Sequence, residues 1–438
     1  MKNNLLFFLL ALFLLTIPLS GEEEGETEIF VEPPAEGAFT GENLSLYGYL
    51  LTFSQVNLLI ENEKITDSNL GRVLYLRLKG DWNPGEHLAF HTELSYDARI
   101  GNQNPYAMYE TPGISSIHQN NYPLEDFVQS FTLDHAWGMV NFWWFDLQFG
   151  KMPIAWGTGY AFNPTDRVTN PAFLDRVTEE TPGTLGIAPG FSITDWLALQ
   201  GYVAFQDKSH KKTASLEDGK WQNIPYGVKL NAIAGPFDLS VSWIKEVLYS
   251  AQGYQRSFYT GADFAGAVWN FGVYGEAALN LPRNEEDTGF DFEGHKLKDV
   301  LEACAGFDYS IPLLDVMARV EYFHHGRGEK SKEDYDIMKI LSGEEILQGE
   351  DYFFASLERT FFNYLTLAVG GMVNLNDRSL ALIPQIQYDL FGNFQVSLGA
   401  TLFFGKEGSE FYGEYEIPGM EPIDFTEPGI YLKGKLSF

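Results

Sequence analysis

Apolar and polar residues alternate along this chain from Leu44 to its end, and this period of two restricts the possible fold more than any other feature. The clearest segment runs from Phe394 to Phe404, where apolar residues are interleaved with polar or small ones such as Gln395 and Ser397. Such alternation is typical of β-strands with one apolar face. We count about eighteen segments of this kind, most of about ten to twelve residues, which is the length of a tilted strand that crosses a bilayer. The pattern predicts an all-β fold.

The connections between these segments also follow a pattern. Short turns are predicted near 83–87, 138–142, 194–195, 235–236, 269–270, 311–313, 361–363 and 392–393. Longer polar stretches lie between them, at 103–126, 153–184, 206–222, 282–298, 326–350 and 406–427. Short turns at one end and long loops at the other are typical of transmembrane barrels, and backbone groups in hydrocarbon must all be paired, so the sheet must close. We therefore predict that residues 43–438 form a transmembrane antiparallel β-barrel of about 18 strands, with 16 as the second choice.

Tryptophans gather near the predicted short turns. Aromatic side chains of this kind form belts at the interface between lipid and water. The tryptophans expected to form such a belt are Trp82, Trp137, Trp143, Trp144, Trp196 and Trp269.

The N-terminus predicts export. Residues 1–21 combine Lys2, an apolar run from Leu5 to Ile17 and small residues at Ser20 and Gly21, which is the pattern of a secretory signal peptide. Residues 22–42 are rich in carboxylates and are expected to form an acidic periplasmic leader. After residue 21, no stretch of the sequence is long and apolar enough for a transmembrane helix.

Composition excludes several classes of protein. The chain has 29 basic and 60 acidic residues, for a formal charge of −31, which argues against nucleic acid as a partner. Cys304 is the only cysteine, so neither an intrachain disulfide nor a cysteine-based zinc site can form. The aromatic content of 15% excludes disorder for most of the chain.

The C-terminal strand supports a family resemblance. Residues 430–438 alternate in polarity and end in Phe438. In this respect the chain resembles bacterial outer-membrane β-barrel proteins, namely porins in the wider sense, over roughly 44–438. The resemblance implies a location in the outer membrane, contact with its lipid, and recognition of Phe438 by the barrel assembly machinery. Because general porins are often trimers, it also raises the possibility of a homotrimer.

The polar face of the predicted strands is expected to line a water-filled channel. This face also includes Asp81, Asp97, Asp238, Asp308, Asp315, Asp389 and Lys435, and over the whole face eleven acidic side chains stand against six basic ones, which predicts weak cation selectivity. The residues predicted to line the pore are Arg77, Lys79, Glu93, Asp146, Lys229, Glu276, Glu302, Arg319, Glu321, Gln385, Gln387 and Lys433.

The long stretch 153–184 is the candidate constriction. It follows the fifth predicted strand, and in general porins the third long loop, which has the same ordinal position, folds into the barrel, so the resemblance implies the same here. Its Trp156 and Phe162 could anchor it to the wall, and Gly157 and Gly159 allow a close approach of the backbone. The residues expected at the constriction are Trp156, Asp166, Arg167, Asp175, Arg176, Glu179 and Glu180. A loop that packs on the outer rim is the alternative. The segment with Trp156-Gly157 and Asn163-Pro164-Thr165-Asp166 is also similar to part of alginate-export-like porins.

Evidence for catalysis is weak. The sequence has no Gly-x-Ser-x-Gly motif, although His87, His91, His118 and His135 could still meet a serine or an aspartate in the folded chain. Neighbouring residues of a strand point to opposite faces, so His324 and His325 do not form a metal site together. We expect no enzyme activity, no resident metal and no cofactor.

These observations predict a porin for passive diffusion of small hydrophilic solutes and ions. Two alternatives remain open. One is a substrate-specific outer-membrane transporter of saccharides or fatty compounds, and the other is a structural or adhesive barrel whose loops carry the function.

Overall fold

The computed structural model describes residues 39–40, 43–61, 64–101, 127–168, 180–206, 221–250, 253–283, 289–291, 293–342, 345–412, 414–415, 423–424 and 428–438. The predicted signal peptide 1–21, most of the predicted leader 22–42 and the loop 103–126 lie outside this part of the chain. The last residues of the leader form a short strand, β1 (Phe39–Thr40), which pairs with Ser45 and Leu46.

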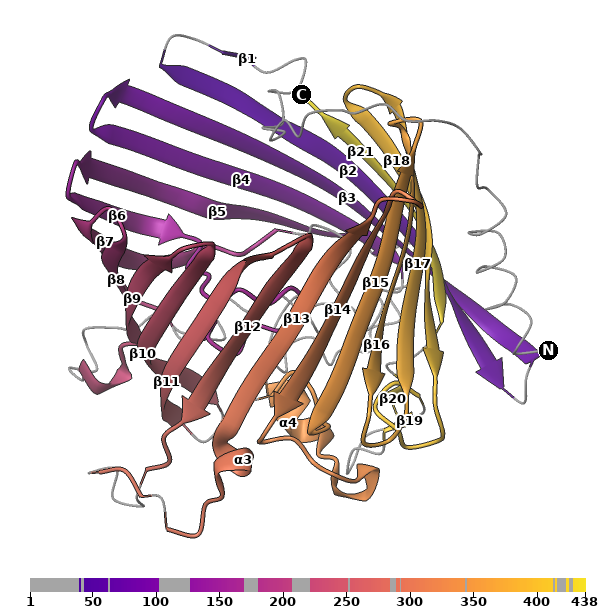
Figure 1. Cartoon of the computed structure of the whole chain (residues 1–438). Coiled ribbons are helices and arrows are strands. Elements are labelled where there is room, and N and C mark those ends of the chain that lie inside the picture. Colours follow the sequence, from indigo (N-terminus) through magenta and orange to yellow (C-terminus); the bar gives the residue numbers. More distant parts are fainter. Residues whose placement is uncertain are drawn as a thin grey trace.

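Long antiparallel strands make up most of the described chain (Figure 1). Their bounds are β2 (Leu44–Glu61), β3 (Lys64–Gly85), β4 (Leu88–Gly101), β5 (Phe127–Phe142), β6 (Phe145–Met152), β7 (Thr184–Thr194), β8 (Leu197–Ala204), β9 (Tyr226–Ala234), β10 (Phe237–Ser250), β11 (Gly253–Val268), β12 (Phe271–Asn280), β13 (Leu301–Ile311), β14 (Val316–His325), β15 (Asp351–Phe361), β16 (Leu365–Asn374), β17 (Leu380–Phe391), β18 (Phe394–Phe404) and β21 (Gly429–Ser437). A two-stranded sheet, β19 (Glu414–Tyr415) and β20 (Ile423–Asp424), lies in the last long connection.

These strands close into a barrel. Each of β2 to β17 pairs with the next strand in the chain, and β21 pairs with both β18 and β2. At the seam, the backbone groups of Gly48 and Phe438 exchange two hydrogen bonds of 2.8 and 2.9 Å. Within the described residues the barrel therefore has 18 strands, which confirms the first choice of the sequence analysis and leaves no open sheet edge.

The two faces of the wall differ in chemistry. In β2, Tyr49, Leu51 and Phe53 are buried inside the barrel, whereas Leu50 and Val56 point outward and are exposed. The same alternation of apolar, exposed side chains with buried ones continues through β3, β7, β9 and β10. The outer surface is therefore largely apolar, and buried polar side chains gather in the interior, which is the reverse of a water-soluble protein.

The two ends of the barrel carry connections of different length (Figure 1). Tight turns join most pairs of strands at one end. The other end carries the long connections, with the short helices α3 (Leu297–Val300), η4 (Lys332–Asp334) and α4 (Ile337–Ser342). A further short helix, η3 (Trp221–Asn223), precedes β9. No helix in the described residues is both long and apolar enough to cross a membrane.

Most of the tryptophans follow the prediction, with one correction. Trp82, Trp143, Trp144, Trp196 and Trp269 are exposed at or beside the short turns. Trp137 instead points inward, where its ring stacks on His91 at 5.2 Å between centroids. The turn predicted at 138–142 was also misplaced, because β5 continues to Phe142 and the turn lies at 143–144.

Candidate functional site in the barrel interior

The side chains predicted to line a channel lie at inward-facing positions of their strands. In each strand they alternate in step with the buried residues, whereas the exposed apolar residues lie on the opposite face. They are Arg77 and Lys79 in β3, Glu93 in β4, Asp146 in β6, Lys229 in β9, Glu276 in β12, Glu302 in β13, Arg319 and Glu321 in β14, Gln385 and Gln387 in β17, and Lys433 in β21. Many are packed rather than open to water, since Arg77 is 1% exposed and Glu321 is 0% exposed.

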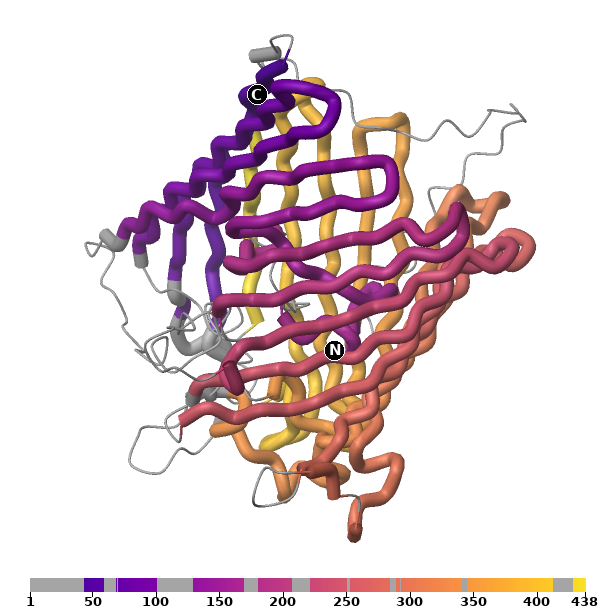
Figure 2. Tube along the Cα trace, turned by 90° about the vertical axis from the view of Figure 1, so that its left-hand side faces the viewer, coloured from indigo at the N-terminus to yellow at the C-terminus, as the bar shows by residue number. Residues whose placement is uncertain are grey.

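After β6 the chain enters the barrel. We name residues 153–168 the inner segment. The backbone N–H groups of Tyr160 and Phe162 each donate a hydrogen bond of 2.8 Å to the carboxylate of Glu321, and the N–H of Ala161 lies 3.3 Å from both of its oxygens. Because Glu321 is on the inner face of β14, these contacts hold the inner segment against the inside of the wall. Figure 2 shows this part of the trace between the near and far strands.

Two further carboxylates of the wall bind the inner segment. The hydroxyl of Thr165 donates a hydrogen bond of 2.6 Å to Glu276 in β12. The guanidinium of Arg167 forms a short ion pair with Glu302 in β13. Burial disfavours the charged guanidinium, but the neighbouring carboxylates outweigh this effect and raise the pKa of Arg167 above its ordinary value. Polar contacts therefore fix the segment to three adjacent strands.

Aromatic packing adds to this attachment. The ring of Phe162 stacks on Phe323 of β14 with 4.5 Å between centroids. Trp156 packs edge-on against Tyr202 of β8 at 4.8 Å. The thiol of Cys304 donates a hydrogen bond of 3.2 Å to the carbonyl oxygen of Phe162. The segment thus reaches from the β8 side of the interior to the β14 side.

Two glycines allow this close approach. Gly157 has a φ of +109°, and a Cβ added there would lie 2.7 Å from a carboxylate oxygen of Glu276. A Cβ on Gly159 would lie 1.8 Å from the carbonyl oxygen of Phe162. Any larger residue at either position would displace the backbone or its neighbours.

The residues predicted at the constriction fall into different environments. Asp166 and Arg167 are buried, and the charge of Arg167 is directed at the wall. Glu180 lies on the β2–β3 side of the interior, with an oxygen 3.0 Å from Lys79 Nζ and 3.2 Å from the hydroxyl of Tyr49. Trp156 packs against Tyr202, and the remaining three, Asp175, Arg176 and Glu179, lie outside the described part of the chain.

A cavity of about 670 Å³ lies near the short turns of β7 to β10. Its lining includes three aspartates and one lysine, namely Asp195, Asp238, Asp263 and Lys229, together with Thr158 of the inner segment. Lys229 forms an ion pair of 3.1 Å with Asp263, which leaves an excess of negative charge. The volume is in the range that accommodates a small organic solute.

A second polar cluster lies at the opposite end, beneath the long connections. Glu410 is buried and accepts hydrogen bonds from the hydroxyl of Tyr352 at 2.5 Å, the amide of Asn374 at 2.6 Å and the backbone N–H of Gln348 at 2.9 Å. Burial raises the pKa of Glu410 to about 7. This carboxyl group joins two of the long connections to the barrel rim.

The histidines do not form a hydrolytic site in the described residues. His91 and His135 meet across β4 and β5, but the groups hydrogen-bonded to their rings are carboxylates and a backbone carbonyl, not a serine hydroxyl. His87 is exposed beside a short turn, and His118 lies outside the described chain. Sequence reasoning named these histidines but did not predict that Glu93 lies between two of them.

Comparison with protein-family models and with curated protein sequences gives no match. Among solved structures, the crystal structure of Acinetobacter baumannii OccAB3 is similar to 90% of this chain and 99% of its own, with 10% identity and a TM-score of 0.52. A mutant of Rh. blastica porin matches 90% of this chain and 100% of its own, with 9% identity and a TM-score of 0.42. The OccAB3 match shows a shared barrel fold, and the predicted resemblance to porin-type barrels is confirmed at that level.

Proposed function

We propose that this chain is an outer-membrane channel for passive diffusion of small hydrophilic solutes and ions, with weak preference for cations. Its apolar exterior suits lipid, and its inner face is polar, so filtering by size and charge needs no covalent chemistry. The inner segment narrows the passage. In this proposal, Phe438 is the residue that the assembly machinery reads, and residues 1–21 direct export.

One observation carries the proposed selectivity. The cavity of about 670 Å³ is lined by Asp195, Asp238 and Asp263 against the single lysine Lys229. Solutes that pass through this region meet a net negative wall, which raises the local concentration of cations. Asp238 is an exposed member of this set, so its charge acts on water and ions more than on the protein.

The test is the reversal potential of the purified protein in a planar bilayer under a salt gradient. The unchanged channel should give a small potential of the sign expected for cations, and D238K should move it toward zero or reverse it. E407K is the matched control, because Glu407 is exposed in a long connection outside the barrel wall and should leave the potential unchanged. Equal potentials for the unchanged channel and D238K would contradict the proposed source of selectivity.

A further inference from the structure

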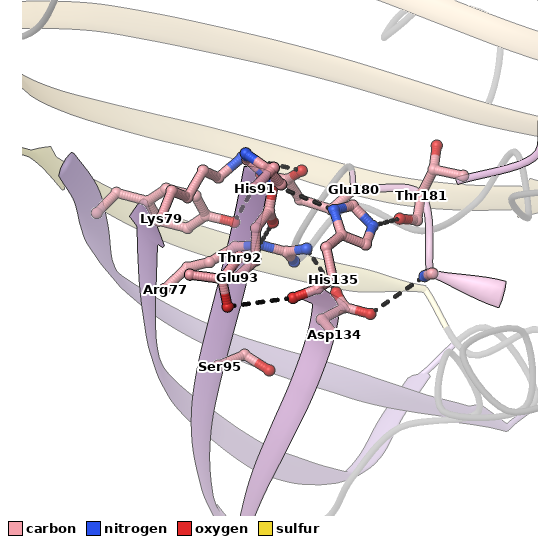
Figure 3. A network of polar contacts seen from close by, with 12 residues as sticks. Arg77, Lys79, His91, Thr92, Glu93, Ser95, Asp134, His135, Glu180 and Thr181 are labelled. Carbon is pink, nitrogen blue, oxygen red and sulfur yellow. Dashed lines mark hydrogen bonds and ion pairs between the residues drawn. The ribbon is translucent and has the colours of Figure 1, made fainter. Parts of the chain in front are cut away.

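Three potential metal ligands converge on the inner face of β4 and β5 (Figure 3). Nε2 of His91 lies 2.7 Å from Oε1 of Glu93, and Nδ1 of His135 lies 3.1 Å from the same oxygen. The three ligand atoms all lie within 4.8 Å of one another. A single ion could therefore contact all of them with little movement of the side chains.

A β-bulge creates this arrangement. The register between β4 and β5 shifts after Glu93. Glu93 pairs with His135, but the next residue, Leu94, pairs with Leu133. Asp134 is the extra residue. As a result, two consecutive side chains reach the interior: Asp134 pairs with Arg77, and His135 turns toward Glu93. Bulges often redirect side chains in this way next to functional sites.

The outer ring nitrogens of both imidazoles face acceptor groups. Nδ1 of His91 lies 2.6 Å from a carboxylate oxygen of Asp81, and Nε2 of His135 lies 3.0 Å from the carbonyl oxygen of Thr181. Both partners can only accept, so each of these nitrogens carries a proton. In a neutral ring the inner nitrogen then presents a lone pair to Glu93, which is itself an acceptor. When both rings are neutral, three lone pairs face one point, an arrangement that a cation bound between them would stabilise.

The charges around the cluster do not balance. Asp81 contacts His91 directly, and the basic side chains Arg77 and Lys79 contact Glu93. Arg77 and Lys79 are in turn paired with two more carboxylates, Asp134 and Glu180, so the group holds four carboxylates and two basic side chains. With neutral imidazoles this gives a net charge of −2, which one divalent cation would neutralise. Two imidazolium ions would do the same, and the experiment below distinguishes the two cases.

We propose that His91, Glu93 and His135 bind one Zn²⁺ ion inside the barrel. Two imidazoles and one carboxylate form a recognised zinc ligand set, which leaves a fourth position open. Asp81 and the Thr181 carbonyl orient the rings from behind, as the outer partners of zinc-bound histidines do. Imidazole ligands favour Zn²⁺ over Mg²⁺ and Ca²⁺, which prefer oxygen.

The remaining neighbours suit a bound ion. Arg77 holds the other oxygen, Oε2, of Glu93, which leaves Oε1 for the metal. Lys79 Nζ is 3.5 Å from Oε1 but 3.0 Å from Glu180, so a metal ion would shift it fully to Glu180. Thr181 lies just before β7 and contacts His135 through its carbonyl oxygen. A bound ion that fixes the His135 ring would therefore also fix the backbone of Thr181.

The experiment is zinc binding by the full-length, tag-free protein in detergent. After chelator treatment, equilibrium dialysis with elemental analysis should show one bound Zn²⁺ per chain. D81N should weaken binding by about 10- to 100-fold through loss of ring orientation, and H91Q or H135Q should weaken it further. H87Q is the matched control and should bind like the unchanged protein, because His87 is exposed outside the cluster.

Two more measurements keep the proposal falsifiable. Heat-dependent gel mobility shows whether each variant has folded. If a histidine variant fails to fold, X-ray absorption of the zinc-loaded unchanged protein must show two imidazole ligands. Three results would each overturn the site. The first is that the protein does not bind one Zn²⁺ per chain. The second is that folded H91Q and H135Q bind zinc as the unchanged protein does, and the third is that both imidazole rings stay protonated when zinc is present.

Discussion

The attachment of the inner segment to Glu321 makes a quantitative prediction for E321Q. The two oxygens of this buried carboxylate accept 2.8 Å hydrogen bonds from the N–H groups of Tyr160 and Phe162, respectively. Glutamine keeps one acceptor and puts an NH₂ group against the other N–H. A hydrogen bond to a charged group contributes about 1.5 to 3 kcal/mol, and a buried donor without a partner costs a similar amount. We expect docking of the inner segment to weaken by about 3 kcal/mol, or about 100-fold in its equilibrium.

Single-channel recording measures the consequence. In E321Q the inner segment should leave the wall for part of the time, so the current should fluctuate between levels that the unchanged protein does not visit. E358Q is the control, since it makes the same chemical change at an exposed carboxylate of β15. If E321Q and E358Q both give the steady current of the unchanged protein, the carboxylate does not hold the segment and the reasoning is refuted.

Three other variants test separate parts of the structure. Burial raises the pKa of Glu410 from 4.5 to about 7. The neutral carboxyl group therefore contributes to the free energy of unfolding fully below pH 4.5, and this contribution is lost as pH rises through about 7. E410Q should remove this pH dependence, about 3 kcal/mol, from the free energy of unfolding measured with denaturant. R167M removes the guanidinium that compensates the negative charge of buried Glu302, and it should destabilise the barrel by up to about 3 kcal/mol. If the ion pair is responsible, the double variant R167M/E302Q should regain part of that stability. G159A should increase current fluctuations, because the added Cβ would clash with the carbonyl oxygen of Phe162. G392A is the control, since no atom lies within 4 Å of its Cβ. Equal effects of the two variants would argue against the close backbone contact at Gly159.

The strands and their closure could be predicted because a strand repeats every two residues. The parity of a residue within each strand indicates which face it occupies, and Arg77, Glu93 and Lys433 share the parity of the buried side chains of their strands. Exact turn positions were harder, as the misplaced turn at 138–142 shows. Apolar residues on both sides of that turn give no local signal for where the chain reverses.

The details of the interior could not be predicted, since they depend on pairing and on contacts distant in sequence. The bulge at Asp134 sends His135 inward, and no local pattern marks it because the register is set between two strands. The contact between Tyr160 and Glu321 joins residues that are 161 positions apart. The burial of Arg167 also follows from such a contact, which turns its charge toward Glu302 of β13.

The most direct test of the proposed channel is the current through the purified, folded protein in a planar bilayer. A channel predicts discrete steps of conductance that carry small ions. A barrel that is folded by its heat-dependent gel mobility, but that passes no current at any applied voltage, would contradict the account and favour a closed structural or adhesive barrel.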